Sequence, residues 1–471
     1  MTDPNNGAGR YRLGPAHKKL PSWRWEALKT TFWLAPTVMV LVAGVLFVVT
    51  FEVDWAAYHQ HVRLPFWIES GSADAAREVL IAIAAAVITV VGVVFSITIL
   101  ALTLASQQFG PRMMRNFVRD VGNQLTLGTF VATFVYSVLA LASITSVAHR
   151  PDFVPHLSIT IAEALLLVDL AVLIYFIHHI AKSIQLPEVI AGIARDLLGA
   201  IDAEFPLPGT GEAVPAPASN DKPVPELVRL LDDRGATVAA TTSGYLQFVG
   251  YAQLVAIASR LDAVIRLNHR PGHFVVAGRP LATVWPQGAA EQVRLALSQA
   301  HVTGPHRTLM QDPVFAIDQL VEIAIRALSP AVNDTFTALT CIDWLSAGLS
   351  RLSGRALSEA VYRDEFGRSR LITSDPSYAH MVNRAVDKIR QAARGMPAVI
   401  IRLLDALSVV AEQTTSAPQR RVLLRQAEMV LLSAEESVPE PNDLADIRLR
   451  YQRFLARCQE AEGGPVPPAS A

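Results

Sequence analysis

The sequence predicts a mainly α-helical membrane protein: a four-helix transmembrane domain followed by a cytoplasmic α+β module and a helical C-terminal region. Three observations predict this class. Four long apolar segments lie in the first 180 residues of a 471-residue chain. Only 12 of the 41 Lys and Arg residues precede residue 181, so the second half has the composition of a soluble protein. Short strand-like segments and then helical periodicity follow.

The four apolar segments are long enough to span a membrane. A helix needs about 20 apolar residues to cross the ~30 Å hydrocarbon core of a bilayer. The segments are joined by short connections, which leave too little polar surface to cover them in a soluble protein. We therefore expect lipid around them. The predicted spans are 32–51, 79–105, 125–147 and 157–180.

Flanking charge predicts the orientation, because cytoplasmic connections carry an excess of Lys and Arg. The first 30 residues carry six basic residues, and the second connection carries three between 112 and 119. The first and third connections carry two and one. We therefore expect a multi-pass protein of the bacterial inner (plasma) membrane with both termini in the cytoplasm. The first span is too long for a cleaved signal peptide.

The second predicted span carries a stripe of small and polar residues on one face, at about 100° per residue. Two interpretations are open. The stripe packs closely against other helices, or it lines a pathway in a homo-oligomer, with a polar inner mouth. The stripe consists of Gly92, Ser96, Thr103, Gln107 and Gly110, and the predicted inner mouth of Gln108, Arg112 and Arg115.

The fourth span contains ionisable residues at membrane depth, where such groups are energetically expensive and therefore functional candidates. Glu163 and His178 share a face, whereas Asp169 points elsewhere. Asp169 is predicted either to have an ion or proton role or to form a structural tie to a polar residue of the third span. The candidate partners are Thr133, Tyr136 and Ser137.

The chain is predicted to divide into six regions. These are a tail at 1–30, the transmembrane domain at 31–184, a juxtamembrane helix and Pro-rich linker at 185–235, the α+β module at 236–311, a helical cytoplasmic domain at 312–460 and a disordered tail at 461–471. A hairpin is predicted near 363–373.

His269 and His273 flank a predicted turn at 268–272 in the α+β module. No carboxylate or cysteine stands at ligand spacing from them, so the sequence predicts no metal site there.

A cluster of polar residues lies at the start of the helical domain. Asp312 and Pro313 are suited to the first turn of a helix. Three charged residues spaced by four would stack on one face of that helix, and an Asn-Asp pair would cap the next. The alternatives are a solvated charged face, or a polar pocket or subunit contact. The cluster consists of Asp318, Glu322, Arg326, Asn333 and Asp334.

Several functions have no support in the sequence. The chain has no P-loop, GxGxxG, GxSxG or HExxH motif, so we predict that it is not an enzyme. No basic excess predicts nucleic-acid binding, and no pattern predicts a cofactor or metal. Cys341 and Cys458 are predicted to be buried free thiols.

Two motifs resemble a known family. The first is Val94-Phe95-Ser96 followed by Gln108-Phe109-Gly110-Pro111-Arg112, and the second is Ala327-Leu328-Ser329-Pro330 followed by Asn333-Asp334. Together they resemble the bacterial predicted membrane proteins called domain of unknown function 2254, over roughly residues 20–440. Thr335 stands where the family often has proline. The resemblance implies a membrane protein and supplies no catalytic residue.

Two functional hypotheses follow. The first is an oligomeric channel or transporter for an ion or small solute, which is gated by the cytoplasmic half. The alternative is a membrane-anchored scaffold or sensor, which binds a partner or ligand through its soluble half. The expected partners are the lipid bilayer and further copies of the chain, and the ligand is left open.

Overall fold

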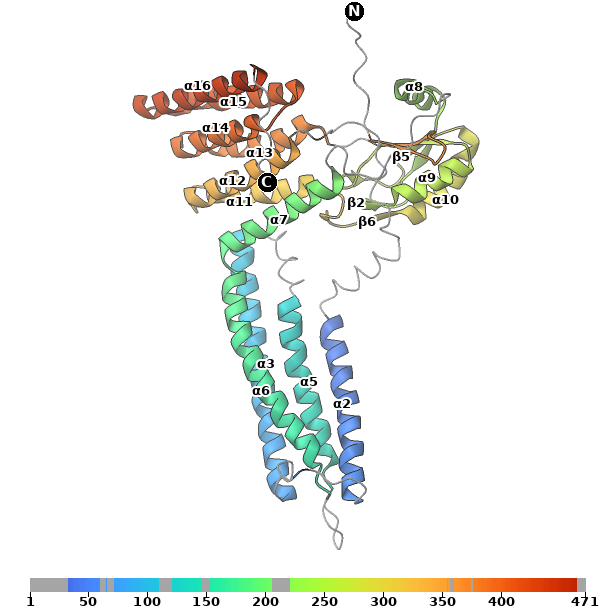
Figure 1. Cartoon of the computed structure of the whole chain (residues 1–471), viewed down its shortest axis with the longest axis vertical. Coiled ribbons are helices and arrows are strands. Elements are labelled where there is room, and N and C mark those ends of the chain that lie inside the picture. The colour runs from blue at the N-terminus through green and yellow to red at the C-terminus, as the bar shows by residue number, and fades with distance from the viewer. Residues whose placement is uncertain are drawn as a thin grey trace, which may run out of the picture. The chain divides into compact units, whose positions relative to one another are not determined.

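The computed structural model describes residues 33–59, 65, 72–109, 121–145, 153–205, 221–353, 355, 360–373 and 376–463 (Figure 1). Beyond residue 104 in the second span only the backbone is described, and the predicted tail at 1–30 lies outside these residues. The chain divides into two compact units. The first, Pro21–Glu188, contains the predicted spans, and the second contains the described residues from Val189 onwards.

The first unit is a bundle of four helices, each long and apolar enough to cross a membrane, as predicted. Helices α2, α3 and α6 are longer than their apolar segments, because helical hydrogen bonding continues through flanking polar residues, whereas α5 has the predicted 23 residues but begins four residues earlier. The second has 37 residues and is about 55 Å long. The helices are α2 (Leu34–Tyr58), α3 (Ala73–Phe109), α5 (Val121–Ser143) and α6 (His156–Ser183).

The bundle is apolar outside and partly polar inside. Leu167 is 69% exposed, whereas Asp169 two residues later is 2% exposed. Helix α5 packs against α2, α3 and α6, and at Gly128 a Cβ atom would lie 3.2 Å from the backbone of Pro36 in α2. This distribution is the reverse of that in a soluble protein, and it agrees with lipid around the bundle.

Asp54, near the C-terminal end of α2, caps the N-terminus of α6. Its carboxylate accepts hydrogen bonds from the backbone N–H groups of Leu157 (2.8 Å) and Ser158 (2.9 Å). It also accepts one from the Ser158 hydroxyl at 2.7 Å. The first N–H groups of a helix have no partner within it, so this side chain satisfies them from a neighbouring helix.

The second unit begins within α7 (Leu186–Glu204), where the juxtamembrane helix was predicted. The prediction of a linker up to 235 was wrong at its end, because helix α8 (Val224–Arg234) occupies these residues. Leu227 and Leu231 of α8 bury against Val264 and Ile372. This burial gives a short, proline-initiated helix the tertiary support that its length requires.

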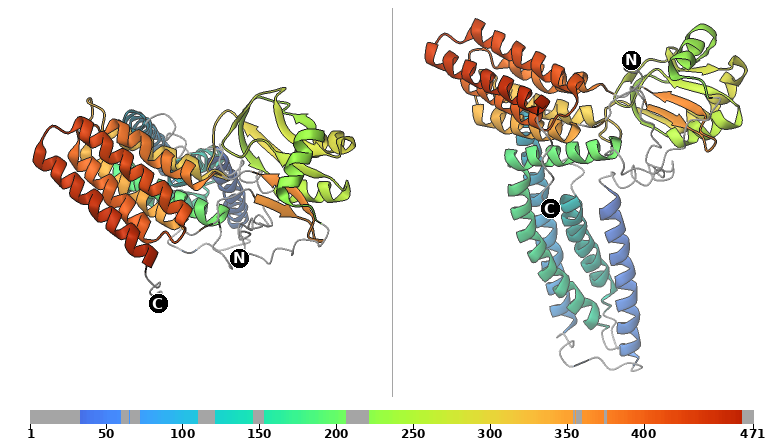
Figure 2. Two further views of the ribbon diagram at one scale, coloured as in Figure 1. Left: turned by 90° about the horizontal axis from the view of Figure 1, so that it is seen from above. Right: turned by 45° about the horizontal axis from the view of Figure 1, so that its top comes forward.

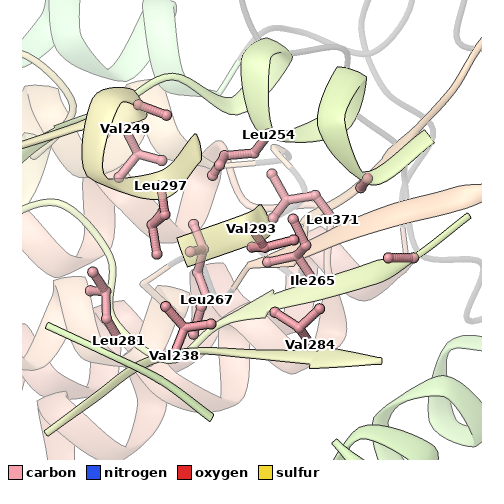
Figure 3. Close-up of a cluster of buried hydrophobic side chains, with 14 of the residues drawn as sticks. Val238, Val249, Leu254, Ile265, Leu267, Leu281, Val284, Val293, Leu297 and Leu371 are labelled. Atoms are coloured by element: carbon pink, nitrogen blue, oxygen red, sulfur yellow. The ribbon is translucent and has the colours of Figure 1, made fainter. Parts of the chain in front are cut away.

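Two sheets form the α+β module, and α9 and α10 pack on them around a shared core (Figure 3). The five-stranded sheet has the order β1-β5-β3-β8-β7, and the three-stranded sheet β4-β2-β6. The elements are β1 (Ala236–Ala239), β2 (Gly244–Val249), α9 (Tyr251–Arg260), β3 (Val264–Leu267), β4 (Phe274–Val275), β5 (Pro280–Trp285), η1 (Gln287–Ala289), α10 (Ala290–Ala300), β6 (His301–Gly304), β7 (Ala360–Arg363) and β8 (Ser369–Thr373).

The predicted hairpin near 363–373 exists, but it belongs to the module rather than to the helical domain. Strand β8 pairs in parallel with β3, with Ile265 opposite Leu371. Tyr362 and Leu371 are part of the module's buried core. The expected boundary between the module and a continuous helical domain at 312–460 was therefore wrong, because the chain returns to the sheet once.

The remaining helices pack side by side in the predicted helical region (Figure 2). Both cysteines are buried and free, as predicted, and burial raises the pKa of the Cys341 thiol to about 12. Helix α16 includes the first three residues of the predicted disordered tail. The helices are α11 (Pro313–Ala327), α12 (Thr335–Leu352), α13 (Tyr378–Ala392), α14 (Pro397–Glu412), α15 (Ala417–Ser437) and α16 (Pro441–Gly463).

Candidate functional site

A cavity of about 180 Å³ lies in the second unit, between the module and the first helices that follow it. It is lined by the turn after β3, the segment before α11 and the N-terminal part of α13. Most of the lining side chains are basic or can become so. The ionisable lining residues are Arg270, His273, Arg307, Asp312, His380 and Arg384.

The turn after β3 is fixed by backbone hydrogen bonds. The Gly272 N–H donates to the Leu246 carbonyl at 2.8 Å, and the Leu246 N–H donates to the His273 carbonyl at 2.9 Å. Gly272 has a φ of +92°, and a Cβ atom there would lie 2.1 Å from Asp312 Oδ2. Only glycine allows this turn to approach Asp312 so closely.

Both acidic groups at the cavity are already bound by arginines. Arg307 donates from Nε and Nη2 to Asp312 Oδ2 at 2.8 and 2.7 Å, and from Nη1 to Asp318 Oδ2 at 2.6 Å. Arg384 donates to both oxygens of Asp318, at 2.8 and 2.5 Å. Arg307 and Arg384 thus form one network with these two carboxylates, and Arg270 adds a third guanidinium group to the lining of the cavity.

Two helices begin at the cavity wall. Asp312 and Val314, at the start of α11, line it, as does His380 in the first turn of α13. Ser377 caps α13 by accepting a hydrogen bond from the His380 N–H at 3.1 Å. The positive ends of both helix dipoles thus add to the arginine charges, and helix N-termini favour bound anions.

The pKa values of the two lining histidines are lowered by burial and by the positive charge of the nearby arginines. Burial, followed by the charge of Arg270 and by His269, lowers the pKa of His273 to about 4. Burial, then Arg270 and Arg384, also lowers the pKa of His380, against a smaller opposite effect of Asp318. Both imidazoles are therefore neutral at pH 7 while the cavity is empty.

The arrangement is suited to a small oxyanion. Arginine forks and imidazole N–H groups recognise phosphate, sulfate and carboxylate oxygens. The cavity is smaller than the ~300–1,000 Å³ of sites that enclose drug-sized ligands. No group of three His, Cys, Asp or Glu side chains suited to a metal ion occurs in the part of the chain that the structure describes.

The predicted cytoplasmic polar cluster is not one cluster. Asp318 is bound by two arginines that line the cavity, Arg307 and Arg384, whereas Asn333 and Asp334 lie beyond the other end of α11, which buries most of its residues. Asp334 caps α12, as predicted, and Asn333 has a positive φ of 50°. Glu322 and Arg326 are half-buried one and two turns beyond Asp318, so the interpretation as a solvated face was wrong.

The described part of the span-two stripe faces outwards. Gly92, Ser96 and Thr103 are exposed, and the two hydroxyls bond to carbonyls of their own helix, at 2.8 and 2.9 Å. No atom lies within 4 Å of a Cβ built on Gly92. These three residues are therefore not packed against another helix among the described residues, and packing against a helix of another copy stays a prediction. Nothing is described of the Gln107 and Gln108 side chains, or of Gly110, Arg112 and Arg115.

The ionisable residues of the fourth span lie on different faces of the helix, as predicted. Glu163 and His178 are exposed, whereas Asp169 is buried in the bundle. Of the predicted partners, Thr133 contacts Asp169, with 3.2 Å between Thr133 Oγ1 and Asp169 Oδ1. Tyr136 instead bonds to Thr50.

Sequence reasoning missed four residues of the cavity: Arg270, Arg307, His380 and Arg384. They come from three separate segments: the turn after β3, the segment before α11, and α13, where His380 and Arg384 are four residues apart. A further local signal was available, since Arg307 stands five residues before Asp312 at the predicted start of α11. Of the basic lining residues only His273 was singled out from the sequence, as a residue that flanks the turn.

Comparisons with known proteins agree with the membrane prediction. The family model described as predicted membrane protein (DUF2254) matches residues 29–409. The uncharacterized proteins Mb1321c of Mycobacterium bovis and Rv1290c of Mycobacterium tuberculosis are each 35% identical over 407 residues, which cover 85% of this chain and 76% of theirs. No solved structure matches the chain.

Gly272→Ala should destabilise the second unit and distort the cavity. The left-handed conformation costs about 1–2 kcal/mol for a non-glycine residue, and the Cβ would also displace Asp312 from Arg307. Thermal unfolding of the purified protein in detergent measures the loss. Gly278→Ala is the matched control, because φ is +81° there but no atom lies within 4 Å. Equal losses in the two variants would contradict the close contact.

Proposed function

Since the chain belongs to the family of predicted membrane proteins named DUF2254, we propose that it is a membrane-anchored sensor whose second unit binds a small oxyanion. The observation that carries this proposal is the convergence of three arginines and two helix N-termini on one cavity. The proposal develops the sensor hypothesis and assigns no catalytic step, so the absence of enzyme activity stays a prediction.

The ligand class follows from the chemistry of the cavity. Arg307 and Arg384 are held by carboxylates, so their guanidinium groups are pre-oriented, and little side-chain entropy is lost when an anion enters. The neutral histidines add N–H donors without requiring a second counter-charge. A phosphate, a sulfate or the carboxylate group of a small metabolite fits these donors.

We also propose where the sensor lies in the cell. The distribution of Lys and Arg among the connections supports an inner-membrane protein with the second unit in the cytoplasm. The oxyanion would then come from the cytoplasmic pool, and the bundle would keep the binding unit at the membrane surface. Proteolysis of inside-out and right-side-out vesicles distinguishes this orientation from its opposite.

Arg270→Gln should weaken binding of inorganic phosphate and sulfate by about 10–100-fold, because one charge-assisted hydrogen bond contributes roughly 1.5–3 kcal/mol. Isothermal titration of the full-length protein in detergent measures the affinity. Arg402→Gln is the control, since Arg402 pairs with Asp343 at 3.3 Å and does not line the cavity. The proposal fails if the unaltered protein binds neither anion, or if both variants bind equally.

Sulfate affinity should rise as the pH falls from about 8 to about 5. His273 titrates near pH 4 in the empty cavity, and a bound dianion would raise this pKa and that of His380. The occupied cavity then holds more protons than the empty one, so binding takes up protons. Sulfate keeps its double charge throughout this range. A doubly substituted protein, His273→Gln with His380→Gln, should show a flatter profile; an unchanged profile would remove the histidines from the site.

A second candidate function is conduction of an ion or small solute by a homo-oligomer. It is favoured by the outward-facing stripe of Gly92, Ser96 and Thr103, which the described helices leave uncovered. Flux from liposomes should be lost when Ser96 or Thr103 is changed to Leu. Thr98→Leu is the control, because Thr98 lies on another face of α3 and also bonds to its own helix. A monomer without flux would remove this candidate.

A further inference from the structure

The carboxyl group of Asp169 is buried in the bundle with one of its two oxygens unpartnered among the described residues. Its side chain is almost wholly buried near the middle of α6. Oδ1 accepts a hydrogen bond from Thr133 at 3.2 Å, but Oδ2 has no hydrogen-bond partner among the described residues. A buried carboxyl oxygen without a donor is rare in folded proteins, and in a membrane span it marks a functional group.

No basic side chain of the described bundle offsets this group. The bundle's described residues include two such side chains, Arg77 and Lys182. Arg77 pairs with Asp74 at 3.2 Å, and Lys182 pairs with Glu188 at 3.5 Å. Glu163 and His178 lie on the exposed part of α6. An ionised carboxylate at Asp169 would therefore stand uncompensated in apolar surroundings, which favours a bound proton.

Hydroxyl groups continue from Asp169 towards the end of the bundle that carries Asp54. Ser137 follows Thr133 by one turn of α5, is fully buried, and its Oγ has no partner among the described residues. The residue before Ser137 is Tyr136, whose hydroxyl oxygen lies 2.8 Å from Thr50 Oγ1.

The same series continues to Asp54 without a gap. Ser158 Oγ lies 3.1 Å from Thr50 Oγ1 and 2.7 Å from Asp54 Oδ2. Each hydroxyl can accept one proton while it releases another. A hydrogen-bonded series of this kind reaches from the Asp54 end to Tyr136. Ser137 is the residue after Tyr136, and its Oγ is hydrogen-bonded neither to Tyr136 nor to Asp169.

In the opposite direction along α5 the buried residues begin with an aromatic one. Phe130 precedes Thr133 by three residues and is 2% exposed. Asn123, Gln124 and Thr126, which are also buried, lie earlier on α5. The hydrogen bonds of the hydroxyl series lie on the other side of Thr133, towards Asp54.

We propose that Asp169 is a proton-binding site within the bundle, which exchanges protons with the Asp54 end through Ser158, Thr50 and Tyr136, and through water that enters beside the unpartnered Ser137 Oγ and Asp169 Oδ2. On loading, a hydronium ion at the Asp54 end gives up a proton, and each hydroxyl or water passes its own proton to the next. The last O–H bond forms at Asp169 Oδ2. The carboxylate becomes a neutral acid, one positive charge enters the bundle, and a water molecule remains outside.

Infrared spectroscopy of the full-length protein in liposomes tests this proposal. A carbonyl band of a protonated carboxylic acid should be present at neutral pH and lost in Asp169→Asn. Glu163→Gln is the control, because this carboxyl is exposed on the same helix. If Asp169→Asn leaves the acid band unchanged, Asp169 holds no proton and the proposal is overturned.

The route has its own readout. In D2O the Asp169 band should shift as the proton exchanges, and Tyr136→Phe should slow this exchange at least tenfold while it keeps the ring. Thr50→Val removes the neighbouring hydroxyl and gives a second variant if Tyr136→Phe does not fold. An exchange rate unchanged in the folded variant would overturn the route. Arg270→Gln should leave every infrared result unaltered, which separates this proposal from the oxyanion sensor.

Discussion

Polar atoms removed from water need a partner inside the protein, and both units of this chain are organised by that requirement. In hydrocarbon the backbone satisfies it through helices, so the spans are helical from end to end. The requirement also explains Asp54. The first N–H groups of α6 would be unpaired at its start, and a carboxylate from α2 binds two of them. This contact fixes the two helices against each other.

The same requirement organises the cavity of the second unit, but with full charges. Arg307 is nearly buried and is compensated by Asp312 and Asp318, with Arg384 completing the network. The network joins the segment before α11 to α11 and α13. Gly272 brings the turn after β3 against Asp312, and with it Arg270. The convergence of three arginines on the cavity is therefore a product of the packing, since no single segment of the sequence contains all three.

The parts of the fold that depend on local sequence could be predicted. Span number, the helices after residue 377 and strand β3 follow from periodicity and composition, because these are properties of neighbouring residues. The pairing of β8 with β3 could not be predicted, since it joins residues more than a hundred positions apart. Asp318 was recognised as a helix-face residue, but spacing by four identifies only neighbours on the same helix. Its true partners, Arg307 and Arg384, come from other segments.

The two candidate sites differ in the sign of the side chains that characterise them: arginines line the cavity, and a carboxyl group is buried in the bundle. The cavity has more arginines than carboxylates, and its histidines hold no proton at neutral pH because burial and positive neighbours oppose a further charge. Asp169 is a single acid without a basic neighbour among the bundle's described residues. An anion compensates the first and a proton the second. In each case the occupant is the smallest species that completes the charge balance, so both sites are suited to respond to ionic conditions rather than to hold a structural ligand permanently.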